Sequence, residues 1–253
     1  MAATAATEPR SGSRSESDHA SGDEGAAAAT TRTARRVNIL AVSDHVAPLV
    51  YSDRIRERFG HVDLVLSCGD LPLGYLDFIV STLNVPLYGV PGNHDHGAAF
   101  STLSARVLTP GTTNLHGRAV RAQGLTLAGL GGSRRYNGGP WQWSEAAVRR
   151  QLTSMMPRLL LNKLRYGRWL DILVTHAPPR HVHDGEDRCH QGFEAFLPFL
   201  RHCRPRYHLH GHVHVYDNRT VTRTRVGDTV VLNAYGYREL RVSVEASPLP
   251  PAV

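Results

Sequence analysis

Apolar runs recur along the chain, and most of them end abruptly in polar residues. The runs are rich in Val, Ile and Leu with little alternation, which is typical of strands covered on both faces. Helix-like stretches at 50–59 and 144–156 lie between several of them. This alternation of strands and helices predicts an α/β domain. The strand-like runs occupy residues 37–44, 62–70, 85–95, 125–132, 170–179 and 207–214.

Two segments depart from this pattern. Residues 216–245 alternate apolar and polar positions around Gly227-Asp228, which predicts an antiparallel hairpin. Residues 133–169 form a longer excursion between two runs, in which Pro157 is expected to begin a second helix. We interpret this excursion as a candidate helical lid.

The ends of the chain differ from its middle. Residues 1–35 are rich in Ala and lack bulky apolar side chains, so they cannot form a core and are expected to be disordered. One domain is expected to span residues 36–245, followed by a short tail of residues 246–253.

The composition permits a globular domain with a basic surface. The chain has 253 residues, and 41% of them are hydrophobic, which is enough to bury a core. The formal net charge of +7 can attract a polyanion or a small phosphorylated substrate. Only one of the 29 basic residues, Lys163, is a lysine, so we interpret the charge mainly as a compositional bias toward Arg.

The three cysteines, Cys68, Cys189 and Cys203, show no C-x-x-C spacing. This argues against a disulfide framework or a cysteine zinc site, and it favours a reducing, cytoplasmic location. No apolar run approaches the roughly 18 residues of a membrane span, so we expect no membrane association. The oligomeric state is not indicated by the sequence.

Polar side chains collect where the apolar runs end, which is the edge at which α/β folds place their ligands. Oxygen and imidazole donors in this mixture suit borderline metals such as Mn, Fe or Zn. Taken alone, Asp70 can equally cap a helix and His176 can be a hydrogen-bonded core histidine. The residues concerned are Asp44, Asp70, Asn93, His94, Asp95, His176, His212 and His214.

The stretch HLHGHVH at 208–214 is the richest in donors. His208, His210, His212 and His214 share one parity, so on an unbroken strand all four would lie on one face. Such a face makes a poor core and a good metal site. Gly211 is expected to bend the chain, which would leave only the last pair pointing inward.

Taken together, these segments resemble the calcineurin-like metallophosphoesterase superfamily over about residues 36–240. The family pattern is D-x-H, G-D, G-N-H-[DE], H and G-H-x-H. The resemblance implies a four-layer α-β-β-α sandwich of two mixed sheets flanked by helices. The matching segments are Asp44-His45-Val46, Gly69-Asp70, Gly92-Asn93-His94-Asp95, His176 and Gly211-His212-Val213-His214.

The resemblance also implies a two-metal centre between the sheets. His94 would lie beside the scissile phosphate, and Asp95 would orient it. Two cations about 3.5–4 Å apart can share a hydroxide nucleophile and stabilise the charge of an in-line phosphoryl displacement. The implied ligands are Asp70 as the bridge, Asn93, His176 and His212 at one metal, and Asp44 and His214 at the other.

The first motif departs from the family pattern, because Val46 stands where the family has His. On a continuing strand, position 46 shares the face of Asp44 and His45 does not. One metal site therefore lacks a nitrogen ligand, and one or two metal ions per chain are expected. Three outcomes stay open: a weak or absent second metal, a substitute ligand, or a backbone turn after Asp44 that brings His45 in.

Two further segments offer additional groups. In THAPPRHVHDGEDRCHQGF, His183 and His190 are candidates for a substitute ligand, although this loop can also simply line the cleft. Arg134 and Arg135 follow the fourth run, and they can either contact a substrate phosphate through bidentate hydrogen bonds or lie in a solvated loop.

These patterns predict a metal-dependent phosphoesterase acting on a small phosphorylated substrate, a phosphodiester or a phosphomonoester. A metal-activated hydroxide would attack, and His94 would assist the leaving group. Two alternatives stay open. The loss of a ligand at Val46 fits a degenerate fold that binds a partner protein, and the basic charge fits a nuclease. Arg bias without interleaved aromatic residues weakens the nucleic-acid alternative.

Overall fold

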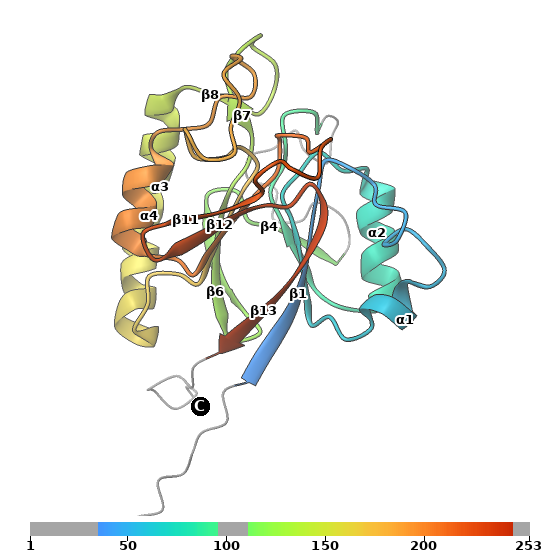
Figure 1. Cartoon of the computed structure of the whole chain (residues 1–253). Coiled ribbons are helices and arrows are strands. Elements are labelled where there is room, and N and C mark those ends of the chain that lie inside the picture. Colours follow the sequence, from blue (N-terminus) through green and yellow to red (C-terminus); the bar gives the residue numbers. More distant parts are fainter. Residues whose placement is uncertain (1–34, 96–110, 245–253) are drawn as a thin grey trace, which may run out of the picture. The chain divides into compact units, whose positions relative to one another are not determined.

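Two mixed β-sheets face each other at the centre of the fold, and a pair of helices covers the outside of each sheet (Figure 1). The expected four-layer α-β-β-α sandwich is confirmed. The computed structural model describes residues 35–95 and 111–244. Apart from Arg35, the tails expected at 1–35 and 246–253 lie outside the described residues.

The first sheet has five strands, of which β1 to β4 are mutually parallel. Its edge strand β13 runs antiparallel to β1 along the whole length of both strands. In spatial order the strands are β13 (Gly236–Val244), β1 (Arg35–Ser43), β2 (Leu64–Ser67), β3 (Leu87–Gly89) and β4 (Thr112–Asn114).

The second sheet has six strands, and its four central strands are parallel. The predicted hairpin is confirmed, since β11 and β12 pair antiparallel across Gly227-Asp228, after which β13 crosses to the first sheet. A short ribbon joins β7 (Ser133–Arg134) to β8 (Gln142–Trp143). In spatial order the sheet contains β11 (Arg223–Val226), β12 (Thr229–Asn233), β10 (Tyr207–His210), β9 (Ile172–Thr175), β6 (Leu125–Leu130) and β5 (Arg118–Ala122).

Three apolar layers hold these elements together. The layer between the sheets joins buried residues of both, such as Leu66 and Leu127. Outside the first sheet, α1 (Ile55–Phe59) and α2 (Leu73–Leu83) pack on β1 and β2. Outside the second sheet lie α3 (Glu145–Tyr166) and α4 (Phe196–Cys203).

Helix α3 differs from the sequence-based expectation. Pro157 was expected to begin a second helix, but it lies inside one continuous helix that is capped by the Ser144 hydroxyl. An interior proline removes one backbone hydrogen bond and costs about 3 kcal/mol. Leu152 and Leu159, on either side of it, are buried against the second sheet, and this packing offsets the loss. Most of the candidate lid segment is thus a helix that covers a sheet.

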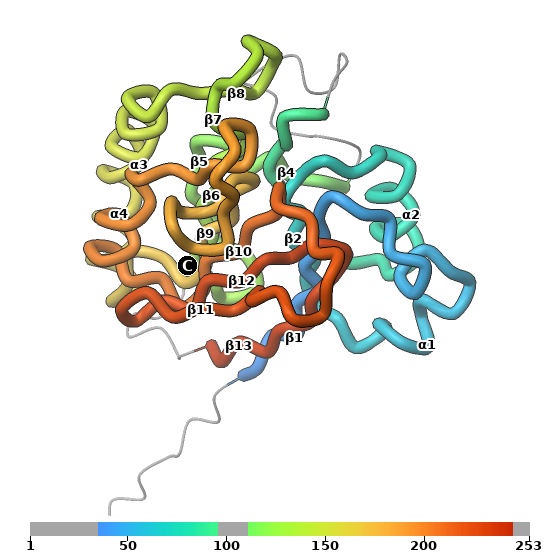
Figure 2. The backbone as a smooth tube through the Cα atoms, turned by 45° about the horizontal axis from the view of Figure 1, so that its top comes forward, coloured from blue at the N-terminus to red at the C-terminus, as the bar shows by residue number. Residues whose placement is uncertain are grey.

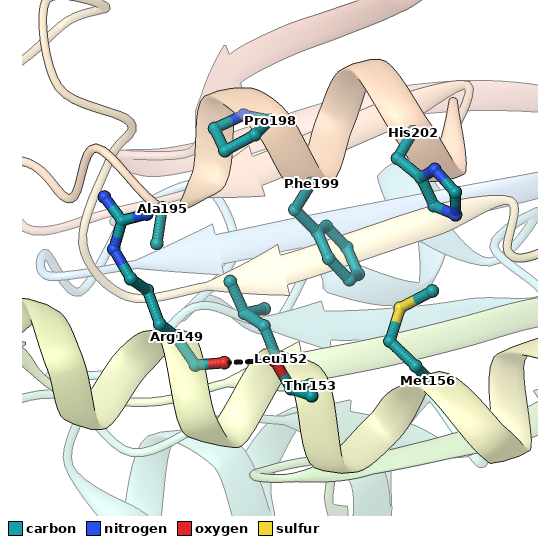
Figure 3. Close-up of a pocket in the computed structure, with 8 residues that line it drawn as sticks. All are labelled: Arg149, Leu152, Thr153, Met156, Ala195, Pro198, Phe199 and His202. Carbon is teal, nitrogen blue, oxygen red and sulfur yellow. Dashed lines mark hydrogen bonds between the residues drawn. The ribbon is translucent and has the colours of Figure 1, made fainter.

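A pocket of about 320 Å³ lies between α3 and α4, where Leu152 and Met156 face Phe199 (Figure 3). It contains none of the predicted site residues. No helix among the described residues is long and apolar enough to cross a membrane.

Candidate metal centre

The carboxyl ends of the parallel strands of both sheets meet at one end of the fold, which Figure 2 turns toward the viewer. Each predicted ligand follows such an end directly or within a few residues: β1, β2, β3, β9 or β10. A strand end has no further ladder partner for its backbone, so the chain can turn there and project polar side chains.

The imidazole of His176 lies at the middle of a group of four donors. Its Nε2 is 2.9 Å from Oδ1 of Asn93, 3.1 Å from Nδ1 of His212 and 3.3 Å from Oδ2 of Asp70. The His176 ring is fully buried, and Asp70 exposes only 9% of its side chain. Lone pairs of oxygen and nitrogen thus converge from four side chains in a site that excludes water, which is the environment of a bound cation.

Backbone carbonyls determine which imidazole nitrogens are free. Nδ1–H of His176 donates to the carbonyl of Cys68 at 2.8 Å, and Nε2–H of His212 donates to the carbonyl of Cys189 at 2.6 Å. A carbonyl can only accept, so these nitrogens carry the hydrogens. The opposite nitrogens, Nε2 of His176 and Nδ1 of His212, are left to bind a metal ion.

Charges around the two rings separate their pKa values. Burial alone lowers the pKa of His176, but the nearby carboxylates of Asp70 and Asp44 outweigh it and raise the value to about 9. Burial and the neighbouring His176 lower the pKa of His212 to about 3. The pKa of Asp70 falls to about 2, because its interactions with His176 outweigh burial. Without a cation, a proton on His176 supplies the positive charge that these carboxylates require.

A second group of donors surrounds Asp44. Oδ2 of Asp44 accepts the backbone N–H of His212 at 2.9 Å, and Oδ1 lies 3.9 Å from Nε2 of His214. Oδ1 is buried and has no hydrogen-bond partner among the described residues. A buried carboxylate oxygen without a donor is costly, and a cation bound between Asp44 and His214 would satisfy it. The donors present therefore fit the metal ions that the resemblance implies.

The backbone at the ligands is unusual. Asp44, Asp70 and His212 have φ angles of 60°, 55° and 68°, in the left-handed region that residues other than glycine seldom adopt. Two glycines allow the carboxylates to sit close, since a Cβ on Gly92 would collide with Asp70 and one on Gly211 with Asp44. Such strain is typical of functional sites.

The backbone turn after Asp44 determines where the side chains of His45 and Val46 lie. The backbone turns there, with His45 N–H donating to the Ser43 carbonyl at 2.6 Å, which is one part of the third expected outcome, while a ligand role for His45 stays a prediction. The half-buried Val46 packs into the apolar layer beneath α1 and α2. The His45 ring is exposed and stacks on Tyr235 with centroids 5.8 Å apart.

The GNHD turn is tied to the end of β2. His94 donates its backbone N–H to Oδ1 of Asp70 at 2.8 Å, and its side chain is exposed. Oδ2 of Asp95 accepts the backbone N–H groups of Gly92 at 2.7 Å and Asp70 at 3.0 Å. Burial raises the pKa of Asp95 to about 6. The carboxylate thus holds the two turns together, and its expected orientation of His94 stays a prediction.

The predicted face of four histidines is divided between two environments. β10 ends at His210, and the left-handed turn at His212 redirects the chain. His208 and His210 are buried on the other face of the second sheet, beside α4. His183 joins them there, with Nδ1 3.0 Å from Nε2 of His210.

The other additional candidates lie in the segments that follow β6 and β9. The His190 ring lies 5.3 Å from the ring of His212, so the structure brings this candidate beside the candidate metal centre. Arg134 is half-buried and its Nη1 lies 3.5 Å from the Gly192 carbonyl, while Arg135 is exposed.

Some groups at the site were not singled out by sequence reasoning. Asn93 Nδ2 donates to the hydroxyl of Tyr136 at 3.3 Å, and Tyr235 packs against His214 with centroids 5.0 Å apart. A signal for Tyr235 existed: it follows the apolar run of β12, which is parallel to β10 and ends at the same edge. Sequence reasoning assigned the β12 run only to a hairpin, so the residue after it was not considered as part of the site.

Comparison with known proteins gives a family match and fold-level similarity. The sequence model described as calcineurin-like phosphoesterase matches residues 37–216. The crystal structure of TT1561 from Thermus thermophilus has 14% identity and a TM-score of 0.56, covering 83% of this chain and 100% of that one. Another crystal structure with 16% identity and the same coverages has a TM-score of 0.58. An archaeal phosphodiesterase has 13% identity and a TM-score of 0.38, covering 81% of this chain and 100% of that one. No curated protein matches the chain.

Proposed function

Because the chain belongs to the calcineurin-like phosphoesterase family, we propose that it is a metal-dependent phosphoesterase that hydrolyses a small phosphate ester. The family usually binds divalent metal ions, and the chain has a group of ligands suited to them. One observation carries the proposal: oxygen and imidazole donors from the turns that follow β2, β3 and β10 lie within 3.3 Å of Nε2 of His176, which follows β9.

Two sets of residues would hold the metal ions. The first is Asp70, Asn93, His176 and His212, and the second is Asp44 and His214, with Asp70 between them. Bound ions of the Mn, Fe or Zn class would supply Lewis-acid stabilisation of phosphoryl charge and a water of lowered pKa. Because Val46 faces the apolar layer, the second set has fewer nitrogen donors, and we expect it to bind its ion more weakly.

Residues of the chain would orient the substrate and assist the leaving group. The backbone of His94 is anchored to Asp70, and its imidazole is exposed on the side where an ester would bind. A protonated imidazole there can donate its hydrogen to the departing oxygen. Asp95 keeps the His94 turn in register with the Asp70 turn through its two backbone hydrogen bonds. A phosphodiester is the preferred substrate class in this proposal.

Hydrolysis of model esters tests the proposal. Protein stripped with a chelator and reloaded with Mn²⁺ should hydrolyse p-nitrophenyl phosphate or bis-p-nitrophenyl phosphate. His94→Ala should lower kcat by about 10²- to 10⁴-fold, with the larger loss for esters of poor leaving groups. The exposed His61, whose Nε2 contacts Glu239, provides the matched control His61→Ala. Folded protein without activity toward either ester under Mn²⁺, Fe²⁺ or Zn²⁺ would contradict the proposal.

The packing of Val46 supports a second candidate function, a degenerate fold that binds a partner protein. A centre without the usual first-motif histidine binds metal less tightly, and a protein used only for binding needs none. Metal analysis of the purified chain separates the two. Tightly bound metal at one or more equivalents favours the enzyme, and its absence favours the binding module.

A further inference from the structure

A second group of metal-binding side chains lies in the loop between β9 and α4. Oδ1 of Asp187 is 2.7 Å from Sγ of Cys189 and 2.8 Å from Nδ1 of His190. Sγ of Cys189 is 3.5 Å from that same nitrogen. One carboxylate, one thiol and one imidazole therefore present donor atoms that all lie within 4.8 Å of one another.

This group is adjacent to the centre described above but has separate donors. The His190 ring packs against the His212 ring at 5.3 Å, and the Cys189 carbonyl accepts the Nε2–H of His212. The three side chains themselves are partly exposed and open to solvent. An ion could therefore reach them without entering the buried centre.

The loop that carries the group is held in place by its own contacts. Arg180 pairs with Asp184 at 2.7 Å and with Glu186 at 3.1 Å. The backbone N–H of Gly185 donates to the His190 carbonyl at 3.1 Å, which closes the loop across the donors. Because the loop is already ordered around the donors, less conformational entropy is lost when an ion binds.

We propose that Asp187, Cys189 and His190 form an additional site for one borderline divalent cation such as Zn²⁺ or Co²⁺. Sulfur and imidazole ligands select such ions over Mg²⁺ and Ca²⁺, which prefer oxygen. Cys189 binds as the thiolate, and its proton is released to solvent. A tetrahedral ion held by three side chains keeps one position open, as in catalytic rather than structural sites.

The cysteine makes this site distinguishable from the first one. The other two cysteines, Cys68 and Cys203, are buried in apolar layers, and the ligands of the first centre include no sulfur. A sulfur-to-metal signal therefore reports on Cys189 alone. It does so whether or not the protein hydrolyses phosphate esters.

Cobalt spectroscopy of the full chain provides the test. Metal-free protein titrated with Co²⁺ should develop the near-ultraviolet sulfur-to-cobalt charge-transfer band with one equivalent bound at this site. The band should be lost in Cys189→Ser and retained in Cys203→Ala. It should also be retained in Asp70→Asn, whose change lies in the first centre. Zn²⁺ should displace the cobalt and remove the band, whereas Mg²⁺ should leave it.

The Co²⁺ affinity, measured from the charge-transfer band, tests whether Asp187 and His190 are ligands. Asp187→Asn and His190→Gln should each weaken Co²⁺ binding by about tenfold or more. Circular dichroism of each variant verifies its fold. A wild-type protein that shows no band, a band that persists in Cys189→Ser, or unchanged affinity in both other variants would overturn the site. Any of these results would identify the three side chains as a hydrogen-bonded loop that binds no metal.

Discussion

Histidines on the two faces of the second sheet have different surroundings, although some are neighbours in sequence. His176 and His212 lie between the sheets, where Asp70, Asn93 and His212 approach Nε2 of His176. His208 and His210 lie on the outer face, beside α4 and β11. Only Gly211 separates His210 from His212 in the chain.

The outer-face group is built from imidazoles and hydroxyls. His208 Nε2 lies 2.7 Å from the Thr175 hydroxyl, and His183 joins His210 to the hydroxyl of Thr224. Within the described residues no carboxylate contacts these rings. Burial lowers the pKa of His208 to about 3 and that of His183 to about 4, so both rings are neutral near pH 7.

The contrast teaches that the neighbours of an imidazole decide its chemistry. Carboxylates raise the pKa of His176 to about 9 in a fully buried position, and His208, equally buried but without them, has a pKa of about 3. A buried ring that prefers a positive charge is suited to exchange its proton for a metal ion. A buried neutral ring with no carboxylate beside it, such as that of His208, contributes hydrogen bonds and packing.

The largest expected effect follows the removal of the shared carboxylate. Asp70→Asn should lower kcat/KM by about a thousandfold, because several kcal/mol of transition-state stabilisation depend on metal binding. Assays with saturating Mn²⁺ measure this loss. The exposed Asp77 of α2 offers the control Asp77→Asn, which should behave as the wild type. Comparable activity in both variants would show that Asp70 is not a metal ligand.

Paired substitutions on the two faces test the contrast directly. His212→Ala should weaken Mn²⁺ binding by about 10- to 100-fold, measured by calorimetry. His210→Ala should leave that affinity nearly unchanged but lower the free energy of unfolding by about 1–3 kcal/mol, since it leaves Nδ1 of His183 without its hydrogen-bond partner. Urea unfolding of the metal-free proteins measures the second effect. Equal losses of metal affinity in both variants would contradict the division between the faces.

Acid should destabilise the outer-face group. The folded pKa of His208, about 3, lies below its ordinary value of 6.5, so the unfolded chain binds more protons and stability falls as pH decreases through this range. Between pH 7 and pH 5 this residue alone should account for about 2 kcal/mol of lost unfolding free energy. Urea unfolding of metal-free protein at several pH values measures it. His208→Gln should reduce the change in unfolding free energy with pH. If the change is the same as in the wild type, the proton that destabilises the fold binds at another residue.

The smallest effect concerns the altered first motif. Val46→His should lower the free energy of unfolding by about 1 kcal/mol, because it places a polar ring in the apolar layer under α1 and α2. Mn²⁺ affinity should not rise, since the side chain at position 46 packs into that layer. A large gain in affinity in calorimetry would show that the turn after Asp44 can rearrange to admit a new ligand.

Much of the fold and of the candidate site could be predicted from local patterns. Continuous apolar runs identified most central strands, and the position of Asp44, Asp70 and His176 after them placed these residues at one edge. Helices α2 and α4 were not among the predicted elements. The course of α3 through Pro157 was predicted wrongly, since local propensity does not include burial of Leu152 and Leu159 against a sheet.

Local sequence patterns could not predict in full which way the side chains at the strand ends point. Parity along an unbroken strand placed Val46 beside Asp44 and grouped His208 with His212, although the expected bend at Gly211 already set His212 and His214 apart from the other two histidines. The left-handed φ angles at Asp44 and His212 break both relations. These conformations are unfavourable locally and persist because contacts from distant elements, such as the Asp44 carboxylate on the His212 amide, hold them.

By itself, the sequence determined where most of the central strands lie along the chain, the polar residues at their ends and the missing histidine at position 46. Those properties are local, because apolar periodicity and residue type can be read without knowing any partner. Only the tertiary structure decided which histidines meet carboxylates, where Val46 packs, and that the loop carrying Asp187, Cys189 and His190 lies beside His212. These outcomes depend on contacts between residues far apart in the chain, and the free energy of such contacts exists only once the two sheets have packed.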